Sequence, residues 1–128
     1  MTACYINGKY KTLSKSSISV TDRGFQFSDG VYEVIAIYNN KFVDENLHLN
    51  RLRTSLNKLN IKINLSSKQI QNISHKIKKL NKISNGIIYL QVTRGDQHPR
   101  DHKYKNIMKP NIVIYSIKKD FKKLEQLA

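Results

Sequence analysis

The stretch TDRGFQFSDGVYEVIAIYNNKF, at Thr21–Phe42, decides the fold because it sets two glycine-containing turns directly before an apolar run. The pairs Arg23-Gly24 and Asp29-Gly30 are typical of a connecting segment. Val31–Tyr38 is rich in β-branched and aromatic residues, which predicts a β-strand. Both faces of that strand are largely apolar, so we expect it at the centre of a sheet. Asn39-Asn40 then predicts a turn into a second hairpin.

Further strands are expected on both sides of this stretch. The sequence CYINGKYKTL, at residues 4–13, predicts a hairpin in which Asn7-Gly8 supplies the positive φ angles of a tight turn. Ile87–Gly95 and Asn111–Ile117 each have the composition of a strand. The segment DQHPRDHKYKNIMKP, at residues 96–110, joins them as a long polar loop, and loops of this length are usually functional or disordered.

Two amphipathic helices are predicted between the strands. Each has a stripe of apolar residues at helical spacing, which we interpret as core packing. The stripes are Leu49, Leu52, Leu56 and Leu59 in the first helix, and Ile70, Ile73, Ile77 and Leu80 in the second. Ser66 and Gln69 form a capping box before the second helix. The predicted fold class is therefore α+β, a mainly antiparallel sheet with two adjacent helices packed on it.

Composition narrows the functional classes. The chain has 128 residues and a formal charge of +14, from 23 basic and 9 acidic residues. Most basic residues are lysines scattered among isoleucine and asparagine, a pattern that A/T-rich codons produce, so we expect neither a nucleic-acid nor a membrane partner. The only cysteine, Cys4, cannot form an internal disulfide, and the sequence shows no secretory signal and no membrane span. We therefore expect a cytoplasmic protein. The same codon bias should remove arginine, so the five arginines are the better candidates for functional residues.

Two regions carry candidate site residues, and their chemistry is open on the residues alone. The loop residues HPRDH, at 98–102, could ligate a metal, could bind an anion through an arginine fork and an imidazole, or could be a solvated loop. Composition favours the solvated loop, and Pro99 argues against a helix that would place both histidines on one face. Arg51, inside the first predicted helix, reads as a surface arginine or as a phosphate ligand.

Four motifs resemble a known family. The blocks DRGFQFSDGVYEV, HLNRLRTSLNKL, IIYLQVTRG and RDH are similar, in order and approximate spacing, to the N-terminal half of the D-amino acid aminotransferases. These are fold type IV (class IV) pyridoxal-phosphate aminotransferases, a group that includes branched-chain aminotransferases and aminodeoxychorismate lyase. The resemblance runs from about Tyr5 to Tyr115. It implies an N-terminal domain at 1–117, a remnant of the interdomain linker at 118–128, and a missing C-terminal domain that carries the cofactor lysine.

The resemblance also implies residue roles. Arg51 would bind the phosphate of pyridoxal 5'-phosphate, and Tyr32 and Val34 would face the substrate. Arg100 and His102 would hold the substrate α-carboxylate in the active site of the other subunit of a homodimer. No catalytic residue is assigned in this chain, because the family lysine would lie beyond Ala128. The sequence departs from the family pattern in two places. Ala36 stands where some members have lysine, and KYKNIMKP, at residues 103–110, replaces a segment containing Phe-Pro.

The expected function is the N-terminal part of an enzyme that transfers the amino group of D-alanine to 2-oxoglutarate, with amino acids and 2-oxo acids as substrates. Transamination needs an amine positioned to move a proton at the substrate α-carbon, so this chain alone is expected to be inactive. Within the family, a branched-chain aminotransferase or an aminodeoxychorismate lyase is the alternative. The chain could also be one half of a split enzyme with a separate C-terminal half, the product of a decayed gene, or a basic domain repurposed for binding.

Overall fold

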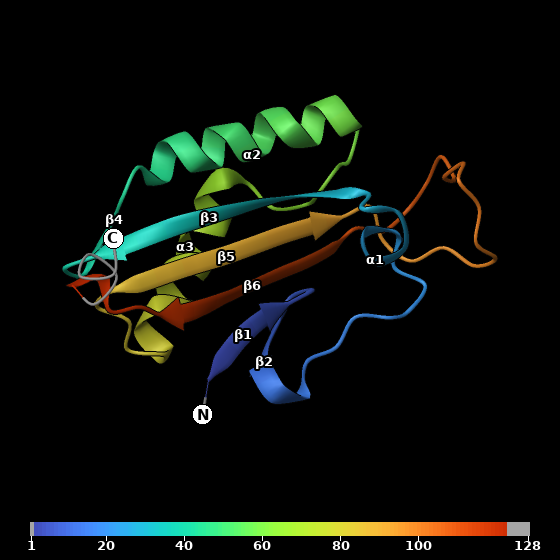
Figure 1. Ribbon diagram of the computed structural model, residues 1–128. Coiled ribbons are helices and arrows are strands. Elements are labelled where there is room, and N and C mark those ends of the chain that lie inside the picture. The colour runs from blue at the N-terminus through green and yellow to red at the C-terminus, as the bar shows by residue number, and fades with distance from the viewer. Residues whose placement is uncertain (1, 123–128) are drawn as a thin grey trace.

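A computed structural model describes residues 2–122, and these residues build a six-stranded sheet in the order β2-β1-β6-β5-β3-β4 (Figure 1). All neighbouring strands are antiparallel. The α+β class predicted from the sequence is confirmed. The strands are β1 Ala3–Ile6, β2 Lys9–Thr12, β3 Gly30–Tyr38, β4 Lys41–Phe42, β5 Gly86–Thr93 and β6 Asn111–Lys118.

Both predicted hairpins form at their asparagine-containing turns. Asn7 has a φ of 47° and Gly8 a φ of 90° between β1 and β2. Asn39 and Asn40, between β3 and β4, have φ angles of 48° and 67°. Asparagine and glycine tolerate this left-handed backbone better than other residues, which is why these positions turn the chain.

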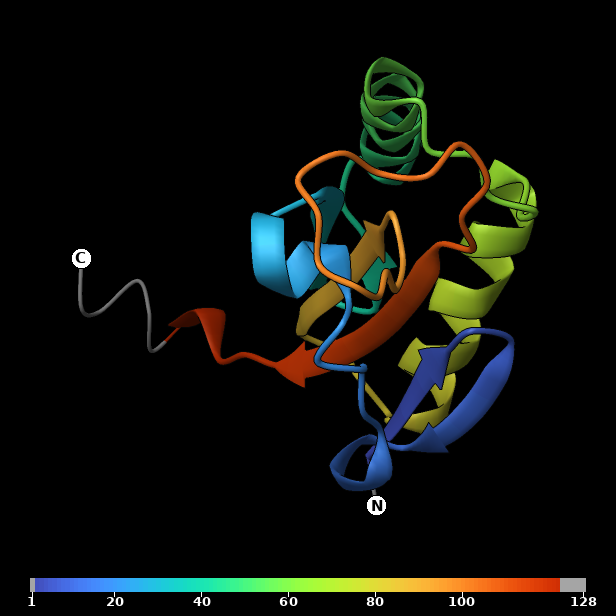
Figure 2. The ribbon, with the colours of Figure 1, turned by 90° about the vertical axis from the view of Figure 1, so that its right-hand side faces the viewer.

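Two helices, α2 (Glu45–Leu59) and α3 (Ser67–Leu80), pack against one face of the sheet (Figures 1 and 2). The first three residues of each predicted apolar stripe are buried in the core, while Leu59 and Leu80 at the helix ends are exposed. The capping box at the start of α3 is confirmed, because the Ser66 side chain and the Gln69 side chain each accept the other residue's backbone N–H. Buried apolar side chains of both helices therefore form the core with the sheet face they cover.

Strand β3 does not occupy the central position predicted for it. It lies second from the edge, and its outer neighbour β4 pairs only with Ile37 and Tyr38. Glu33, Ile35 and Ile37 are buried on the helix side, whereas the alternate residues point to the other face. The prediction of a central strand was wrong because the apolar residues on that second face are exposed or half-buried, rather than covered, in the described part of the chain.

This second face, here called the open sheet face, continues across β5 and β6. Its exposed or half-buried residues include Tyr32, Val34, Tyr38, Tyr89, Tyr115 and Ile117. The rings of Tyr32 and Tyr89 stack with centroids 6.1 Å apart, and those of Tyr89 and Tyr115 lie 5.1 Å apart. No helix within residues 2–122 is both long and apolar enough to cross a membrane.

A short 3-10 helix, η1 (Leu13–Lys15), and a short helix, α1 (Arg23–Phe27), connect β2 to β3. Asp22 caps α1 by accepting the backbone N–H of Phe25, and its carboxylate also accepts hydrogen bonds from the side chains of Thr93 and Asn111. The cap therefore fixes α1 to the ends of β5 and β6. The expected linker begins at Lys118, the last residue of β6, and its residues 123–128 lie outside the described part of the chain.

Candidate active site

Arg51 projects from the middle of α2 and is held by a buried carboxylate on β3. Its Nε donates to Glu33 Oε2 at 2.8 Å, and its Nη2 donates to Glu33 Oε1 at 2.7 Å. His48, one turn earlier on α2, shares Oε1 through its Nδ1 at 2.7 Å. Glu33 is 3% exposed while the Arg51 side chain is 66% exposed, so the pair joins the core to the surface. The two parallel hydrogen bonds fix the guanidinium plane, and Nη1 takes no part in the contact with Glu33.

The charges of this cluster influence one another. Burial raises the pKa of Glu33, but hydrogen bonds and charge from Arg51 and His48 outweigh it and hold that pKa below its ordinary value. The hydrogen bonds from Arg51 to Glu33 raise the pKa of the guanidinium, and nearby Tyr32 adds a smaller contribution in the same direction. Arg51 is therefore a fixed and permanently charged donor.

Tyr32 and Val34 flank Glu33 on β3 and point to the open sheet face. Tyr32 is 64% exposed and Val34 is also exposed, so both present surface to a ligand or a partner. The structure thus brings two of the predicted site residues, Tyr32 and Val34, to one face of β3. Arg51 is on the helix side of the strand, and the other two are on its opposite face.

Arg100 and His102 lie together in the loop at residues 96–110. The Arg100 guanidinium stacks over the Phe27 ring at 4.3 Å from its centroid, and the His102 ring centroid is 4.9 Å from the same ring. Both side chains are exposed. Among the described residues, no cluster of His, Cys, Asp or Glu could hold a metal ion. The pair resembles an anion trap more than a metal site, with a planar cation and an imidazole on one aromatic support.

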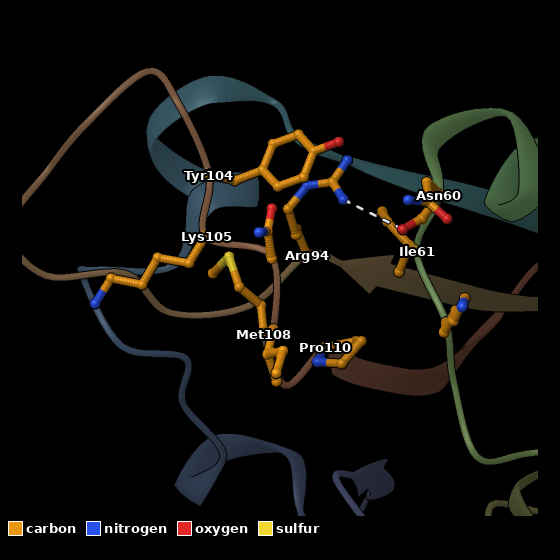
Figure 3. Close-up of a pocket in the computed structure, with 10 residues that line it drawn as sticks. Asn60, Ile61, Arg94, Tyr104, Lys105, Met108 and Pro110 are labelled. Atoms are coloured by element: carbon orange, nitrogen blue, oxygen red, sulfur yellow. Dashed lines mark hydrogen bonds between the residues drawn. The ribbon is translucent and has the colours of Figure 1, made fainter.

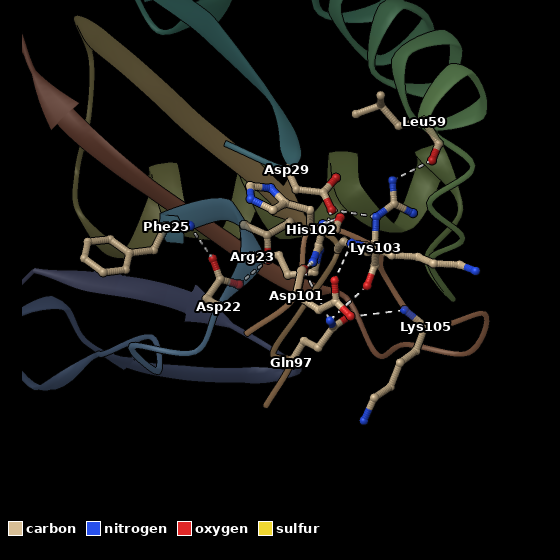
Figure 4. Close-up of polar contacts among 12 residues, drawn as sticks. Asp22, Arg23, Phe25, Asp29, Leu59, Gln97, Asp101, His102, Lys103 and Lys105 are labelled. Carbon is tan, nitrogen blue, oxygen red and sulfur yellow. Dashed lines mark hydrogen bonds and ion pairs between the residues drawn. The ribbon is translucent and has the colours of Figure 1, made fainter. Parts of the chain in front are cut away.

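A group of buried polar residues ties this loop to the rest of the fold (Figure 4). Asp29 Oδ2 accepts hydrogen bonds from Arg23 and Arg94, both at 2.8 Å. Arg94 also donates to Leu59 O at the end of α2, at 2.8 Å. Burial raises the pKa of Asp29, but the hydrogen bonds from Arg94 and Arg23 and their charges bring it below its ordinary value. These three residues therefore join α1, α2, β5 and the loop.

Gln97 organises the loop from within. Its side-chain nitrogen donates to Lys103 O at 3.1 Å, and its side-chain oxygen accepts from Lys105 N at 3.2 Å. Gln97 is buried although its neighbours in the loop are exposed. The polar composition of the loop gave no sign of this internal support.

A pocket of about 310 Å³ opens between the loop and the connection after α2 (Figure 3). Tyr104 covers the Arg94 guanidinium at 3.6 Å from the ring centroid. Asn60, Met108 and Pro110 contribute to its walls. Arg94 donates its Nε to Asp29 and its Nη2 to Leu59 O, and its guanidinium supports the Tyr104 ring of the loop.

Sequence reasoning missed Glu33, His48, Asp29 and Arg94 as parts of these clusters. Glu33 carried a signal, because a carboxylate inside an apolar strand is rarely buried without a partner. The histidine and arginine three residues apart on α2 were compatible with one shared acceptor on that strand. The sequence indicated only that Asp29 and Arg23 belong to a connecting segment. Their mutual bond is local, but their other bonds reach β5 and the loop.

Comparison with known proteins identifies relatives of this chain. The family model for amino-transferase class IV matches residues 30–123. The chain is 40% identical over 97 residues to D-alanine aminotransferase of Listeria monocytogenes, which covers 76% of this chain and 34% of that protein. It is 34% identical over 117 residues to D-alanine aminotransferase of Staphylococcus aureus, covering 91% of this chain and 41% of that protein. The chain thus spans well under half the length of these relatives.

Solved structures share the fold at lower sequence identity. Branched-chain amino acid aminotransferase from Escherichia coli matches with a TM-score of 0.84 and 14% identity, covering 91% of this chain and 39% of that one. The 4-amino-4-deoxychorismate lyase from Pseudomonas aeruginosa matches with a TM-score of 0.70 and 23% identity, covering 90% and 39%. These likenesses concern the fold alone. The match of the family model over residues 30–123, together with the identity to the two D-alanine aminotransferases, shows that this chain belongs to the class IV aminotransferase family.

Proposed function

We propose that the chain is the N-terminal part of a pyridoxal-phosphate-dependent D-amino acid aminotransferase that transfers the amino group of D-alanine to 2-oxoglutarate. The observation that carries this proposal is the pairing of Arg100 and His102 on Phe27, a trap suited to a carboxylate. The 40% identity to a D-alanine aminotransferase supports the same branch of the family. The fold likenesses to branched-chain aminotransferases and to a lyase do not distinguish these branches.

Arg51 fits the phosphate of pyridoxal 5'-phosphate. Its guanidinium is exposed and oriented by Glu33 through Nε and Nη2, and its Nη1 has no hydrogen-bond partner within residues 2–122. A fixed guanidinium with a free N–H is a good donor to a phosphate oxygen. Glu33 neutralises part of the charge, and we propose that further phosphate ligands come from the second half of the enzyme. When bound, the cofactor would supply the electron sink of the reaction.

The substrate side of the site is divided between two places. Tyr32 and Val34 would line the substrate pocket from the open sheet face. Arg100 and His102 would bind the α-carboxylate, and in a homodimer their loop would reach the active site of the other subunit. Ala36 lies on the same face as Val34, and its small side chain would leave room on that pocket wall.

The chemical step needs an amine that moves the proton at the substrate α-carbon. We propose that this amine lies in a second half of the enzyme, joined to this chain or supplied as a separate polypeptide. Residues 1–128 alone are then inactive. A free Cys4 fits the cytoplasm as the cellular location.

A chimera tests the proposed function. Residues 1–117 of this chain replace the matching segment of the Listeria D-alanine aminotransferase, and turnover of D-alanine with 2-oxoglutarate is measured. We expect activity from the chimera, and none from residues 1–128 alone at the same concentration. Arg100→Gln should raise the KM for D-alanine by roughly tenfold or more, because a charged hydrogen bond to the carboxylate is lost.

Three results would contradict the proposal. Turnover of L-leucine without D-alanine would favour a branched-chain enzyme, and lyase activity would favour the aminodeoxychorismate branch. Clear transamination by pure residues 1–128 would refute the need for a second half. The absorbance of bound cofactor and the circular dichroism spectrum serve as controls that the chimera has folded.

A further inference from the structure

Arg23 is a buried arginine that uses all three of its side-chain nitrogens. It is 4% exposed. Its Nε donates to Asp29 Oδ2 at 2.8 Å, its Nη1 to Asp101 O at 2.5 Å, and its Nη2 to His102 O at 2.9 Å (Figure 4). Two of these acceptors are the main-chain carbonyls that directly follow Arg100. Arg23 therefore holds the loop backbone at the residues that carry the carboxylate trap.

Phe27, one helical turn after Arg23, holds the side chains of the same loop. Arg23 lies over the Phe27 ring at 4.6 Å from the centroid, and Arg100 at 4.3 Å. The His102 ring lies 4.9 Å from it. Residues four apart on a helix face the same side, so α1 presents Arg23 and Phe27 together to the loop. Cation–π contacts attract guanidinium groups to the face of the ring and so restrict where they lie.

Further hydrogen bonds hold the residues around Arg23. Asp29 pairs with both Arg23 and Arg94, and Arg94 is tied to Leu59 O. The Arg23 backbone N–H donates to Gly95 O at 2.8 Å, directly before the loop begins. A buried arginine is costly unless its donors are satisfied, and this one satisfies two of its three donor nitrogens on loop carbonyls and the third on Asp29. An arginine in a surface salt bridge is hydrated, so its side-chain nitrogens would not all need protein acceptors.

We infer that Arg23 is the positioning residue for the Arg100–His102 pair. It fixes the backbone carbonyls of Asp101 and His102, while Phe27 fixes the side chains of Arg100 and His102. Arg23 reaches the loop and Asp29 orients Arg23, so the Arg23-Gly24 and Asp29-Gly30 pairs act on the same loop. Only the consequence of this role, the binding of a carboxylate, rests on the proposed function. The positioning itself is a property of this chain and can be measured without turnover.

The test uses NMR on the 128-residue chain and four proteins: wild type, Arg23→Lys, Phe27→Leu and Arg53→Lys. Arg23→Lys keeps the charge but loses the three-way fork. Arg53→Lys is the matched control, since Arg53 also donates to a backbone carbonyl, that of Leu65, but lies away from the loop. Amide exchange is measured at Lys105, and the ring-current shift is measured on the Arg100 side chain. Exchange at Leu90 in β5 reports whether each variant is folded.

We expect Arg23→Lys to speed exchange at Lys105 by roughly tenfold or more, since hydrogen bonds from a charged donor are lost. The Arg100 ring-current shift should shrink with it. Phe27→Leu should abolish the shift while leaving Lys105 protected, because the carbonyl anchors remain. Arg53→Lys should change neither. Wild-type values of both quantities in Arg23→Lys, with Leu90 protected, would overturn the inference.

A D-alanine titration of the same four samples separates this inference from the proposed function. If Arg100 of the wild-type chain responds to D-alanine, we expect at least a tenfold weaker response in Arg23→Lys, in proportion to the lost order of the loop. An equal response in the two proteins would overturn the positioning role. An absence of response in the wild type, together with faster exchange in Arg23→Lys, would support the positioning role and show that carboxylate binding needs the complete enzyme, where the chimera tests it.

Discussion

At the scale of single residues, Glu33 accepts an unusual number of side-chain hydrogen bonds for a strand residue. It is buried in the sheet and accepts three hydrogen bonds, two from Arg51 and one from His48. Its charge is favoured by these donors and disfavoured by burial, and the donors prevail. In the proposed site, the same bonds aim Arg51 at the cofactor phosphate. Glu33 therefore links the stability of the fold to the geometry of the site.

Replacing Glu33 with glutamine should lower the free energy of unfolding at pH 7 by about 1–3 kcal/mol, because a buried amide with one acceptor oxygen then faces three N–H donors. The loss should shrink as the pH falls. The folded-state pKa of Glu33 is below its ordinary value of 4.5, so its stabilising contribution is complete above that value and is lost as the pH falls through the folded-state pKa. Urea unfolding of the wild type and of Glu33→Gln at pH 7 and pH 3 measures both effects.

Glu45→Gln is the control for this prediction. The Glu45 carboxylate also accepts from a histidine, His75, and from the Gln71 side chain, but its histidine partner is half exposed. Exposed ion pairs contribute about 0–1 kcal/mol, so we expect a small change at both pH values. A difference between wild type and Glu33→Gln that stays constant from pH 7 to pH 3 would show that the carboxylate charge has no part in the stability.

At the scale of elements, the loop at residues 96–110 depends on a glycine where β5 ends. Gly95 has a φ of 114°, and a Cβ at this position would lie 2.0 Å from Lys109 O, near the end of the loop. Gly95→Ala should therefore cost about 2 kcal/mol or more of unfolding free energy, from the left-handed backbone and the contact together. Gly8 provides the matched control, since its φ is 90° and a Cβ there would meet no atom within 4 Å.

Thermal or urea unfolding of Gly95→Ala and Gly8→Ala measures this difference. Gly8→Ala carries backbone strain alone, so any excess loss in Gly95→Ala reports the close approach of the loop. Equal losses in the two variants would mean that the loop shifts freely away from β5. That result would also count against the inference that Arg23 holds the loop in one position.

Elements with local signals were predictable from the sequence, and contacts between distant residues were not. The hairpin turns, the helix stripes and the capping box follow from residues a few positions apart, and the structure confirms them. The place of β3 in the sheet depends on which faces the other elements cover, and the prediction of a central strand was wrong. The contacts of Arg23 with Asp101 and His102 join residues nearly eighty positions apart, so no local pattern could reveal them. The family resemblance named candidate site residues but not the residues that contact and orient them.

At the scale of the whole molecule, the sheet has one covered face and one open face. Helices α2 and α3 bury the first, while Tyr32, Tyr38 and Ile117 are exposed on the second. In the described chain, the open sheet face therefore presents a contiguous apolar and aromatic surface, of a kind that usually meets a partner or a further domain. The formal charge of +14 opposes self-association by repulsion between copies. The state of the isolated chain is decided by the balance of these two effects.

We expect residues 1–128 to self-associate through the open sheet face, more strongly as salt rises, because ions screen the repulsion and leave apolar burial almost unchanged. Sedimentation velocity at about 50 and 500 mM NaCl measures the salt effect.

Ile117→Lys places a charge on the open sheet face and should keep the chain monomeric at both salt concentrations. Leu47→Lys is the control, since Leu47 is also exposed but lies on α2, on the helix side of the sheet, and association should persist in it. A wild-type chain that is monomeric at high salt would contradict the prediction. Equal loss of association in both variants would show that added charge, rather than the open face, decides the state.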